Sequence, residues 1–447
     1  MAFGAKNNST YFLILLSLIL YVFSGYFLER TQFVYLAITW VALFGCYYFI
    51  LQKELDNSNL LIQISIIFRL IFLFSIPNLS QDFYRFIWDG RMLLNGFNPY
   101  ESLPETFINQ GLSPVFGAAE LYEGMGELNR SHFSNYPPLN QLSFLIGAFL
   151  GGDSILWTVV ALKIQIVLAD IGIIIYGRKL LKKLGLHPNQ IFWYALNPLI
   201  IIELTGNLHF EPVMLFFVVL SLYKLLQKKW ILAAILLACS VSVKLIPLLI
   251  VPLFFQWFAN FNAKKIVPFL SFGAVVVVIN ILLFLPFLTP SLISNYSDSV
   301  GLWFTNFEFN ASFYYILREL GYLFRGWNEI AIIGKILPVL VVLYILYLSF
   351  IRKIKTTNQF FNILLFAFTI YYLFSTTIHP WYLANLILLA SFSSYRYPMV
   401  WSLAVVLSYL AYASNPYYEN LLVIGIEYLI LFAFIVYEMR SKKKPII

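Results

Sequence analysis

Long runs of apolar residues alternate with short polar segments along almost the whole chain. Many of these runs approach the roughly 20 residues that a helix needs to cross the hydrocarbon core of a bilayer. The pattern therefore predicts a series of transmembrane helices. In chain order, the expected crossings are residues 11–28, 32–51, 60–77, 155–177, 191–205, 209–226, 266–288, 331–351, 358–376, 382–395, 397–413 and 420–439.

Two further apolar segments do not fit one simple crossing. Residues 139–150 are short, and we expect a re-entrant or interfacial helix there. The run from Trp230 to Phe258 is too long for one crossing and too short for two, and Lys244 and Pro247 interrupt its middle. We expect two short helices meeting near the outer leaflet, since broken backbone is tolerated where it lines a cavity within the protein. The fold class is thus an all-α polytopic membrane protein with roughly 12–14 transmembrane helices and a large outer loop after the third helix.

Composition supports a membrane protein and excludes a nucleic-acid-binding one. Hydrophobic residues make up 61% of the 447 residues and charged residues 11%, whereas soluble domains carry roughly 25% charged residues. The net charge of +8 comes from cations at helix ends, as the positive-inside rule describes. Cys46 and Cys239 lie in apolar runs and indicate no disulfide framework. The first apolar segment lacks a small-residue cleavage site, so we expect a retained helix.

The distribution of basic residues predicts the orientation of the chain. Basic clusters should mark the cytoplasmic face, including the C-terminus, and the long polar segments the outer face. We expect a single integral membrane domain over residues 1–447, composed of three N-terminal helices (1–77), a first outer loop (78–139) and a remaining bundle (140–447) with a second outer loop at about 289–330. The clusters are Arg178 to Lys183, Lys224 to Lys229, Lys264 with Lys265, Arg352 to Lys355, and Arg440 to Lys444.

The first outer loop opens on a stretch rich in charged and aromatic residues, Gln81 to Arg91. Within it, Asp82, Arg85 and Asp89 recur at helical spacing and should share one face. Charged residues near a bilayer suggest a functional site, while the alternative is an interfacial helix of ion pairs with an aromatic belt. Tyr136, between this loop and a pair of prolines, is equally compatible with stacking on a sugar or with a structural role.

Three further polar segments are expected near the same face. A turn from Gly206 to Pro212 carries His209 and Glu211, and a turn from Thr376 to Tyr382 carries His379 and Trp381. Each could contact hydroxyl or phosphate groups, or be an ordinary polar turn. Lys244 supplies an ammonium group at membrane depth. Glu308 and Asn310 of the second outer loop are weaker candidates, and Arg69, Lys163, Asp170 and Glu203 are expected to pair within the bundle.

No sequence pattern indicates a cofactor. The chain lacks Cys/His spacing for zinc, a phosphate-binding glycine loop or dinucleotide fingerprint, and a nucleophile elbow. We therefore predict no cofactor and no metal ligand set, with a divalent metal requirement left open.

At these motifs the chain resembles glycosyltransferase superfamily C, the multi-spanning enzymes that take sugars from polyprenyl phosphates. The resemblance is closest to GPI mannosyltransferase I and to bacterial polyprenyl-phosphate-mannose-dependent mannosyltransferases, and it covers roughly residues 78–390. The motifs are DFYRFIWDGRMLLNGFNPY followed by segments at Tyr136, Asn197, Asn207, Lys244 and His379, in the same order. The chain departs from the family in having Gln81 before Asp82 and Glu211 where some relatives have Asp.

The resemblance implies a hexosyl transfer, with mannose favoured, from a polyprenyl-phosphate donor to a hydroxyl group of a glycan or glycolipid acceptor. The reaction is expected to be inverting and extracytoplasmic, in a bacterial inner membrane. Asp82 is expected to be the general base, with Asp89 as second choice. Candidates for donor phosphate binding are Arg85, Arg91, Lys244 and His379, and candidates for sugar or lipid binding are Trp88, Tyr136, His209, Glu211, Trp381 and Tyr382.

Two other classes of membrane protein remain possible at this stage. A lipid-sugar flippase or transporter also uses many helices, a broken helix and intramembrane charge. A lipid-linked glycan polymerase or ligase would use the same type of donor outside the membrane. The one-sided placement of the polar segments favours an enzyme over a transporter.

Overall fold

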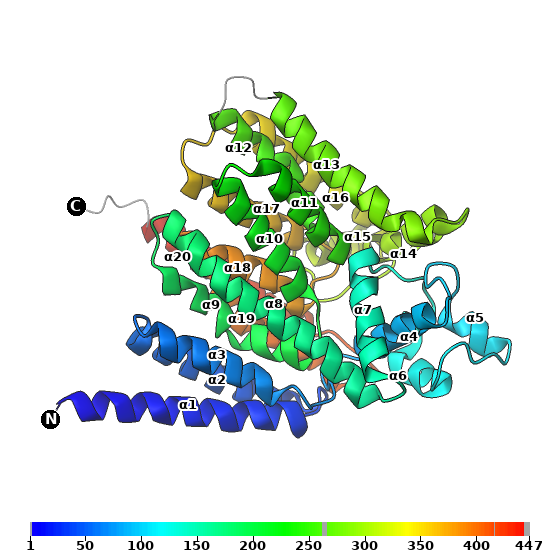
Figure 1. Cartoon of the computed structure of the whole chain (residues 1–447), viewed down its shortest axis with the longest axis horizontal. Helices are drawn as coiled ribbons and strands as arrows, with labels where there is room; N and C mark the ends of the chain where they lie inside the picture. Colours follow the sequence, from blue (N-terminus) through cyan, green and yellow to red (C-terminus); the bar gives the residue numbers. More distant parts are fainter. Residues whose placement is uncertain (1, 262–265, 415, 442–447) are drawn as a thin grey trace.

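The computed structural model describes residues 2–261, 266–414 and 416–441, and within these ranges the chain is helical without a β-strand. Lys264, Lys265 and residues 442–444 of the expected basic clusters lie outside the described residues. The N-terminal helices α1 (Ala2–Tyr26), α2 (Phe33–Glu54) and α3 (Ser58–Ile71) lie together along one edge of the molecule (Figure 1). Both ends of the chain lie on the same side of this view.

The remaining bundle combines long helices with short and irregular ones. Its long helices are α8 (Ile155–Lys183), α10 (Glu211–Leu226), α13 (Ile266–Phe284), α16 (Ile330–Leu346), α17 (Thr357–Leu373) and α20 (Leu421–Ser441). Between them lie η1 (Pro188–Ile191), α9 (Phe192–Ala195), η2 (Ile200–Gly206), α11 (Trp230–Val243), η3 (Ile246–Leu253), α12 (Phe254–Phe261), η4 (Leu285–Phe287), η5 (Tyr347–Ile351), η6 (Pro380–Leu383), α18 (Ala384–Ser391), α19 (Tyr397–Ala404) and η7 (Val405–Ala413).

The expected fold class, an all-α polytopic membrane protein, is confirmed. Among the described residues, six helices are long and apolar enough to cross a membrane, and a seventh crossing is possible if the pair η2 and α10, bent by 113°, forms one span. Further apolar helices are only 10–17 residues long. Several of the 12–14 expected crossings are therefore not continuous α-helices, because proline, π-helical and 3₁₀ segments interrupt them.

The predicted break in the run from Trp230 to Phe258 is present. Lys244 has an extended backbone (φ −147°, ψ 140°) and ends α11, and η3 begins two residues later with Pro247 in its first turn. Proline has no N–H group to leave unpaired at the break, and Pro247 itself is buried. The run therefore forms two short helical segments that meet at Lys244.

Both expected outer loops fold into helices. The first contains α4 (Asp82–Leu94), α5 (Pro104–Asn109) and α6 (Ala118–Arg130), followed by the 14-residue α7 (Pro138–Gly151), and the second contains α14 (Leu292–Thr305) and α15 (Phe313–Arg325). Figure 1 shows α4 to α7 and α14 at the opposite end of the molecule from both termini. A Cβ on Gly90 would lie 2.3 Å from the backbone oxygen of Phe144, so only glycine lets α4 approach α7 this closely.

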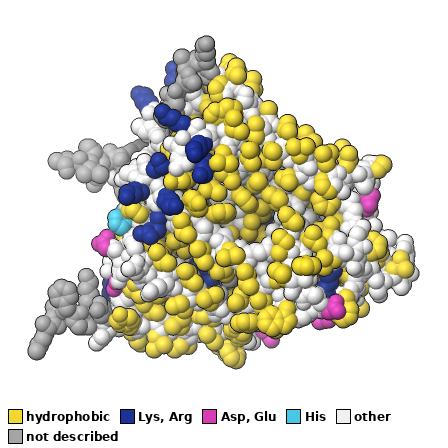
Figure 2. Space-filling model, viewed as in Figure 1, with side chains coloured by type: hydrophobic (Ala, Val, Ile, Leu, Met, Phe, Trp, Pro, Cys, Tyr) yellow, Lys and Arg dark blue, Asp and Glu magenta, His cyan; other side chains and the backbone are white. Residues whose placement is uncertain are grey.

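The surface is mostly hydrophobic, with Lys and Arg gathered on the side where the C-terminus lies (Figure 2). Lys182, Lys183, Lys228 and Lys229, at or just after the ends of α8 and α10, are exposed. A broad apolar belt with cations at one rim is the arrangement expected of a protein that spans a bilayer.

Buried charged groups connect the bundle helices. Arg69 on α3 donates from Nε to Asp170 Oδ2 on α8 at 2.7 Å, and from Nη1 to the backbone oxygen of Ala195 at 2.7 Å. The expected pairing of Arg69 and Asp170 is thus confirmed. Lys163 instead binds the backbone oxygens of Phe72 and Ser75 at 2.8 and 2.7 Å, so that an ammonium group holds the chain just after α3.

Replacing Asp170 by alanine should destabilise the protein strongly, because it leaves the Arg69 guanidinium buried without its carboxylate. We expect a loss of about 3–5 kcal/mol, and a recovery of most of that loss in the double variant Arg69→Met/Asp170→Leu. Thermal unfolding of the purified protein in detergent would measure both effects. An unchanged unfolding temperature for Asp170→Ala would contradict this role of the ion pair.

Candidate functional site

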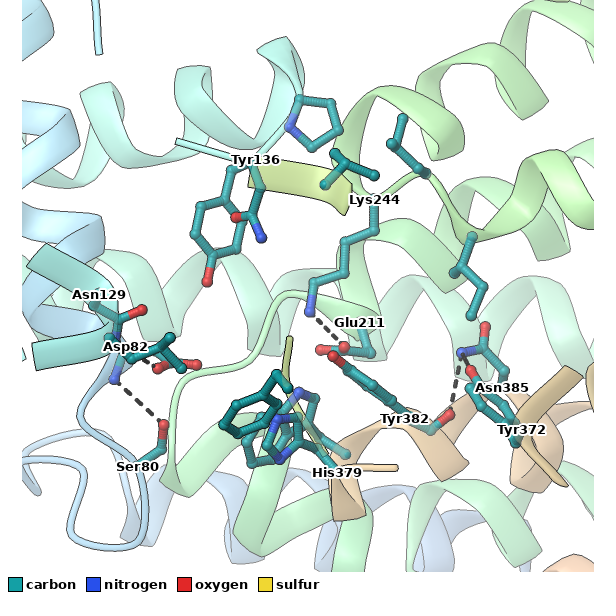
Figure 3. Close-up of a pocket in the computed structure, with 18 of the residues that line it drawn as sticks. Ser80, Asp82, Asn129, Tyr136, Glu211, Lys244, Tyr372, His379, Tyr382 and Asn385 are labelled. Carbon is teal, nitrogen blue, oxygen red and sulfur yellow. Dashed lines mark hydrogen bonds and ion pairs between the residues drawn. The ribbon is translucent and has the colours of Figure 1, made fainter. Parts of the chain in front are cut away.

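A cavity of about 550 Å³ lies where the first outer loop, the breaks in the bundle and the second outer loop meet (Figure 3). Its walls come from parts of the chain that are far apart in sequence. The lining residues are Arg30, Leu79, Ser80, Gln81, Asp82, Leu128, Asn129, His132, Asn135, Tyr136, Pro137, Glu211, Lys244, Leu245, Ile246, Leu248, Leu249, Val300, Phe307, Tyr371, Tyr372, His379, Trp381, Tyr382, Asn385 and Tyr412.

Asp82 is half-buried at the first turn of α4, with its carboxyl group in the cavity wall. Asn129 donates from Nδ2 to Asp82 Oδ1 at 3.0 Å. Burial raises the pKa of Asp82 above its ordinary value, while the hydrogen bond from Asn129 and the charges of Lys244 and Arg30 act in the opposite direction. The result is a carboxyl group suited to accept a proton from a bound hydroxyl group.

Lys244 faces the same cavity from the broken end of α11. Its Nζ atom lies 2.5 Å from Oε1 of Glu211, the first residue of α10, and Oε2 of Glu211 has no hydrogen-bond partner among the described residues. The Lys244 side chain is 20% exposed and that of Glu211 2%. In Figure 3, Tyr136 points into the space between Asp82 and Lys244. One cavity therefore presents a proton acceptor and a cation.

Another part of the wall is formed by His379 and Trp381, which belong to a stack of four rings. His209 stacks on Trp381 with ring centroids 3.9 Å apart, Trp381 on His379 at 4.4 Å, and His379 on Phe309 at 4.9 Å. Burial, together with the positive charge of Lys244, lowers the pKa of His379 to about 3. The His379 imidazole is therefore neutral in the physiological range and can act as a hydrogen-bond donor or acceptor without carrying charge.

Asp89 and Arg85 do not line this cavity. Arg85 Nε donates to Asp89 Oδ1 at 2.7 Å, and Asp89 Oδ2 accepts from Ser134 Oγ at 2.6 Å and Gln141 Nε2 at 2.9 Å. Arg85 and Asp89 are both buried. The end of the first outer loop covers this part of the α4 face that they share with Asp82. Of the two candidate carboxylates, only Asp82 is open to a ligand in this cavity.

Arg91 and Trp88 also lie away from the cavity. The Arg91 guanidinium donates to the backbone oxygens of Phe116 and Gly152 at 2.6 and 3.1 Å, and the Trp88 ring is buried beside Phe107. These side chains hold the first outer loop together. Of the other candidates, Tyr136, Glu211, Lys244, His379, Trp381 and Tyr382 line the cavity, and His209 lies behind Trp381.

The structure adds residues that the sequence did not single out. Arg30, in the loop between α1 and α2, lies over the ring of Tyr412 (4.7 Å to the centroid) and donates to Gln81 Oε1 at 3.1 Å. Asn385, a polar residue in apolar α18, donates to the hydroxyl group of Tyr372 at 2.7 Å. An amide inside an apolar helix is a signal that could have been used, whereas nothing in the sequence distinguishes Arg30 or Asn129 from other polar loop residues.

Among the described residues, no group of three or more His, Cys, Asp or Glu side chains is arranged to hold a metal ion. Asp82 and Glu211 face the cavity from different walls, and the nearest cation to Glu211 is Lys244.

The fold and the cavity define a polytopic membrane protein with an internal cavity whose lining is mostly apolar and carries several charged groups. The family model described as "Alpha-(1->6)-mannopyranosyltransferase, N-terminal domain" matches residues 13–260, more than half of the chain, and the chain belongs to this family. A second model, described as "ALG3 protein", matches residues 207–324. Both matches include Glu211 and Lys244.

A curated relative supports the same family. The chain is 29% identical over 205 residues to alpha-(1->6)-mannopyranosyltransferase A from Corynebacterium glutamicum. The match covers 43% of this chain and 38% of that protein, so it spans well under half of the relative's length. The resemblance to mannosyltransferases of glycosyltransferase superfamily C is thereby confirmed.

His379 should remain uncharged in the physiological pH range. Because the pKa of His379 is lowered to about 3 in the folded state, the unfolded chain binds a proton more readily, and this site favours unfolding as the pH falls below about 6.5 towards 3. We expect no titration of His379 between pH 5 and 8 in nitrogen-15 spectra of histidine-labelled protein. A midpoint near 6.5 would contradict the burial of this ring beside Lys244.

Proposed function

We propose that this chain is a membrane mannosyltransferase that moves a mannosyl group from a polyprenyl-phosphate donor to a hydroxyl group of a glycan or glycolipid acceptor. The observation that carries the proposal is that Asp82 and Lys244 face one cavity, with apolar residues beside the lysine. A base for the acceptor and a cation for the leaving phosphate are what such a transfer requires. Family membership supports mannose as the sugar.

The donor phosphate is assigned to Lys244. The residues that follow it and line the cavity, Leu245, Ile246, Leu248 and Leu249, are apolar and suit the first isoprenoid units of the lipid. An ammonium group binds phosphate oxygens through charge-assisted hydrogen bonds, which are shorter and stronger than neutral ones. Glu211 holds the ammonium group in place before the donor binds. The neutral His379 lies close enough to Lys244 for the positive charge of Lys244 to lower the pKa of His379.

The transfer step is a direct displacement at the anomeric carbon. The acceptor hydroxyl oxygen forms a bond to that carbon, the bond from the carbon to the phosphate oxygen breaks, and the hydroxyl proton passes to the Asp82 carboxylate. The polyprenyl phosphate leaves with the electron pair, and Lys244 stabilises its negative charge. Attack opposite the leaving group inverts the anomeric configuration.

The active site is assigned to the extracytoplasmic face of a bacterial inner membrane, with the C-terminus in the cytoplasm. Support comes from the basic residues gathered on the side of the C-terminus (Figure 2), because cytoplasmic loops carry an excess of Lys and Arg. Asp82 of α4 and Val300 of α14 line the cavity, and Figure 1 shows α4 and α14 on the opposite side of the molecule from the start of α1 and the end of α20.

Replacing Asp82 by asparagine should abolish transfer, because the amide cannot accept the proton. We expect kcat to fall by at least about 10²-fold, while the donor KM changes little since the lysine remains. Radiolabelled polyprenyl-phosphate mannose in membranes or detergent would measure both constants.

Asp89→Asn is the matched control. Its carboxylate is committed to Arg85, Ser134 and Gln141, so we expect a lower unfolding temperature with specific activity per folded protein retained. An active Asp82→Asn enzyme would refute Asp82 as the base. If Asp89→Asn lost transferase activity and Asp82→Asn kept it, Asp89 would be the base instead.

Replacing Lys244 by methionine should weaken donor use. A hydrogen bond to a charged group is worth about 1.5–3 kcal/mol, which corresponds to a rise in donor KM of about 10- to 100-fold. The double variant Lys244→Met/Glu211→Gln removes the unpaired carboxylate as well and separates loss of phosphate binding from damage caused by a buried charge. An unchanged donor KM in the double variant would contradict the assignment of the phosphate to Lys244.

A further inference from the structure

A buried carboxyl group outside the cavity is hydrogen-bonded to residues that contact the cavity lining. Glu203 lies in the π-helical segment η2 and is fully buried, yet it does not line the cavity. Its Oε1 atom accepts hydrogen bonds from the Tyr409 hydroxyl group at 2.5 Å and from Asn207 Nδ2 at 3.3 Å. Among the described residues no lysine or arginine forms an ion pair with it. A buried carboxyl group without a cationic partner is costly, and π-helical segments are frequent at functional sites.

The first connection runs to the segment that carries Asp82. The backbone N–H groups of Leu79 and Asn78 donate hydrogen bonds to Asn207 Oδ1, at 2.9 and 3.3 Å respectively. Asn207 Nδ2 in turn donates to Glu203. Leu79 and the three residues after it, up to Asp82, all line the cavity. Asn207 Nδ2 also donates to the backbone oxygen of Ile202 at 3.1 Å, so Glu203 and Ile202 together orient the amide group that holds the entry to α4.

The second connection runs to the stacked rings. His209 Nε2 lies 3.9 Å from Glu203 Oε2, which is a contact but not a hydrogen bond, and among the described residues neither atom has a hydrogen-bond partner. His209 stacks directly on Trp381, which lines the cavity. A third connection runs through Tyr409 to the helix that carries Tyr412, whose ring lies under Arg30. The three residues that Glu203 contacts, Asn207, His209 and Tyr409, therefore each contact residues of the cavity lining.

We propose that Glu203 is a positioning residue for sugar transfer, which sets the position of the Asp82 carboxylate through Asn207 and the position of the Trp381 wall through His209. This inference rests on the proposed function. Glu203 does not line the cavity. We therefore expect its replacement to disturb the alignment of the reacting groups and to leave donor binding unchanged. A misplacement of about 1 Å by a residue remote from the chemistry can cost about 10²-fold in rate.

The test compares Glu203→Leu with Glu203→Gln in the full-length protein, using radiolabelled polyprenyl-phosphate mannose as donor and octyl α-mannoside as acceptor. Leucine removes both acceptor atoms, and we expect kcat to fall about 30- to 100-fold with the donor KM within about twofold of wild type. Glutamine keeps an oxygen for Asn207 and Tyr409, and we expect it to restore kcat to within about threefold.

Two tyrosine variants test the positioning role even if Glu203→Leu does not fold. Each removes one buried hydroxyl group, and only one of the two hydroxyl groups is bonded to Glu203. Tyr409→Phe removes only the hydroxyl group bonded to Glu203, and Tyr194→Phe removes a buried hydroxyl group bonded to Asp170 at 2.9 Å. Similar losses of stability are expected in both, with a lower kcat per folded protein only in Tyr409→Phe.

Wild-type kcat in folded Glu203→Leu or in Tyr409→Phe would overturn the positioning role, as would equal loss of kcat in both tyrosine variants. These outcomes leave the proposed function intact. Absence of mannosyl transfer by the wild-type protein to octyl α-mannoside and to membrane glycolipid alike would instead refute the proposed function itself.

Discussion

The ion pair between Lys244 and Glu211 joins the two main breaks in the helical bundle. Lys244 ends α11, where the backbone becomes extended, and Glu211 begins α10 after the 113° bend from η2. A single charge at either position would be expensive to bury, so each group is tolerated because the other is present. The cavity forms beside this pair, and the proposed binding of the donor phosphate uses the one ammonium group that the pair holds at that depth.

Helical spacing alone does not reveal that Asp89 is buried while Asp82 faces the cavity. Their positions in α4 predicted a shared face, and α4 does contain both. Which part of that face is covered depends on Ser134 and Gln141, about 45 and 52 residues further along the chain, which bind the second oxygen of Asp89. Long-range packing of this kind leaves no local pattern, whereas the break at Lys244 does, since a charge and a proline in an apolar run are conspicuous.

The same reasoning explains which parts of the fold were predictable. Apolar runs predict helices that need a lipid or protein environment, and the break at Lys244 was found where it was expected. The irregular segments η2 and η7 have the same apolar composition as transmembrane α-helices. Hydropathy therefore does not distinguish their π-helical or 3₁₀ geometry from an α-helix. Glu203 was expected to pair within the bundle, but its contacts with Asn207 and Tyr409 depend on the geometry of these segments.

In the proposed function, the helical bundle presents a small number of cavity groups with separate tasks: Asp82 would accept the proton, Lys244 would bind the phosphate and the stacked rings would contact the sugar. Donor phosphate and base would then lie in this one cavity. The most direct measurement is an experimental structure of the protein with a non-transferable polyprenyl-phosphate mannose analogue. We expect a phosphate oxygen within hydrogen-bond distance of Lys244 Nζ and the anomeric carbon on the side facing Asp82. A phosphate bound outside the cavity, or with Lys244 still paired only to Glu211, would contradict the proposed function.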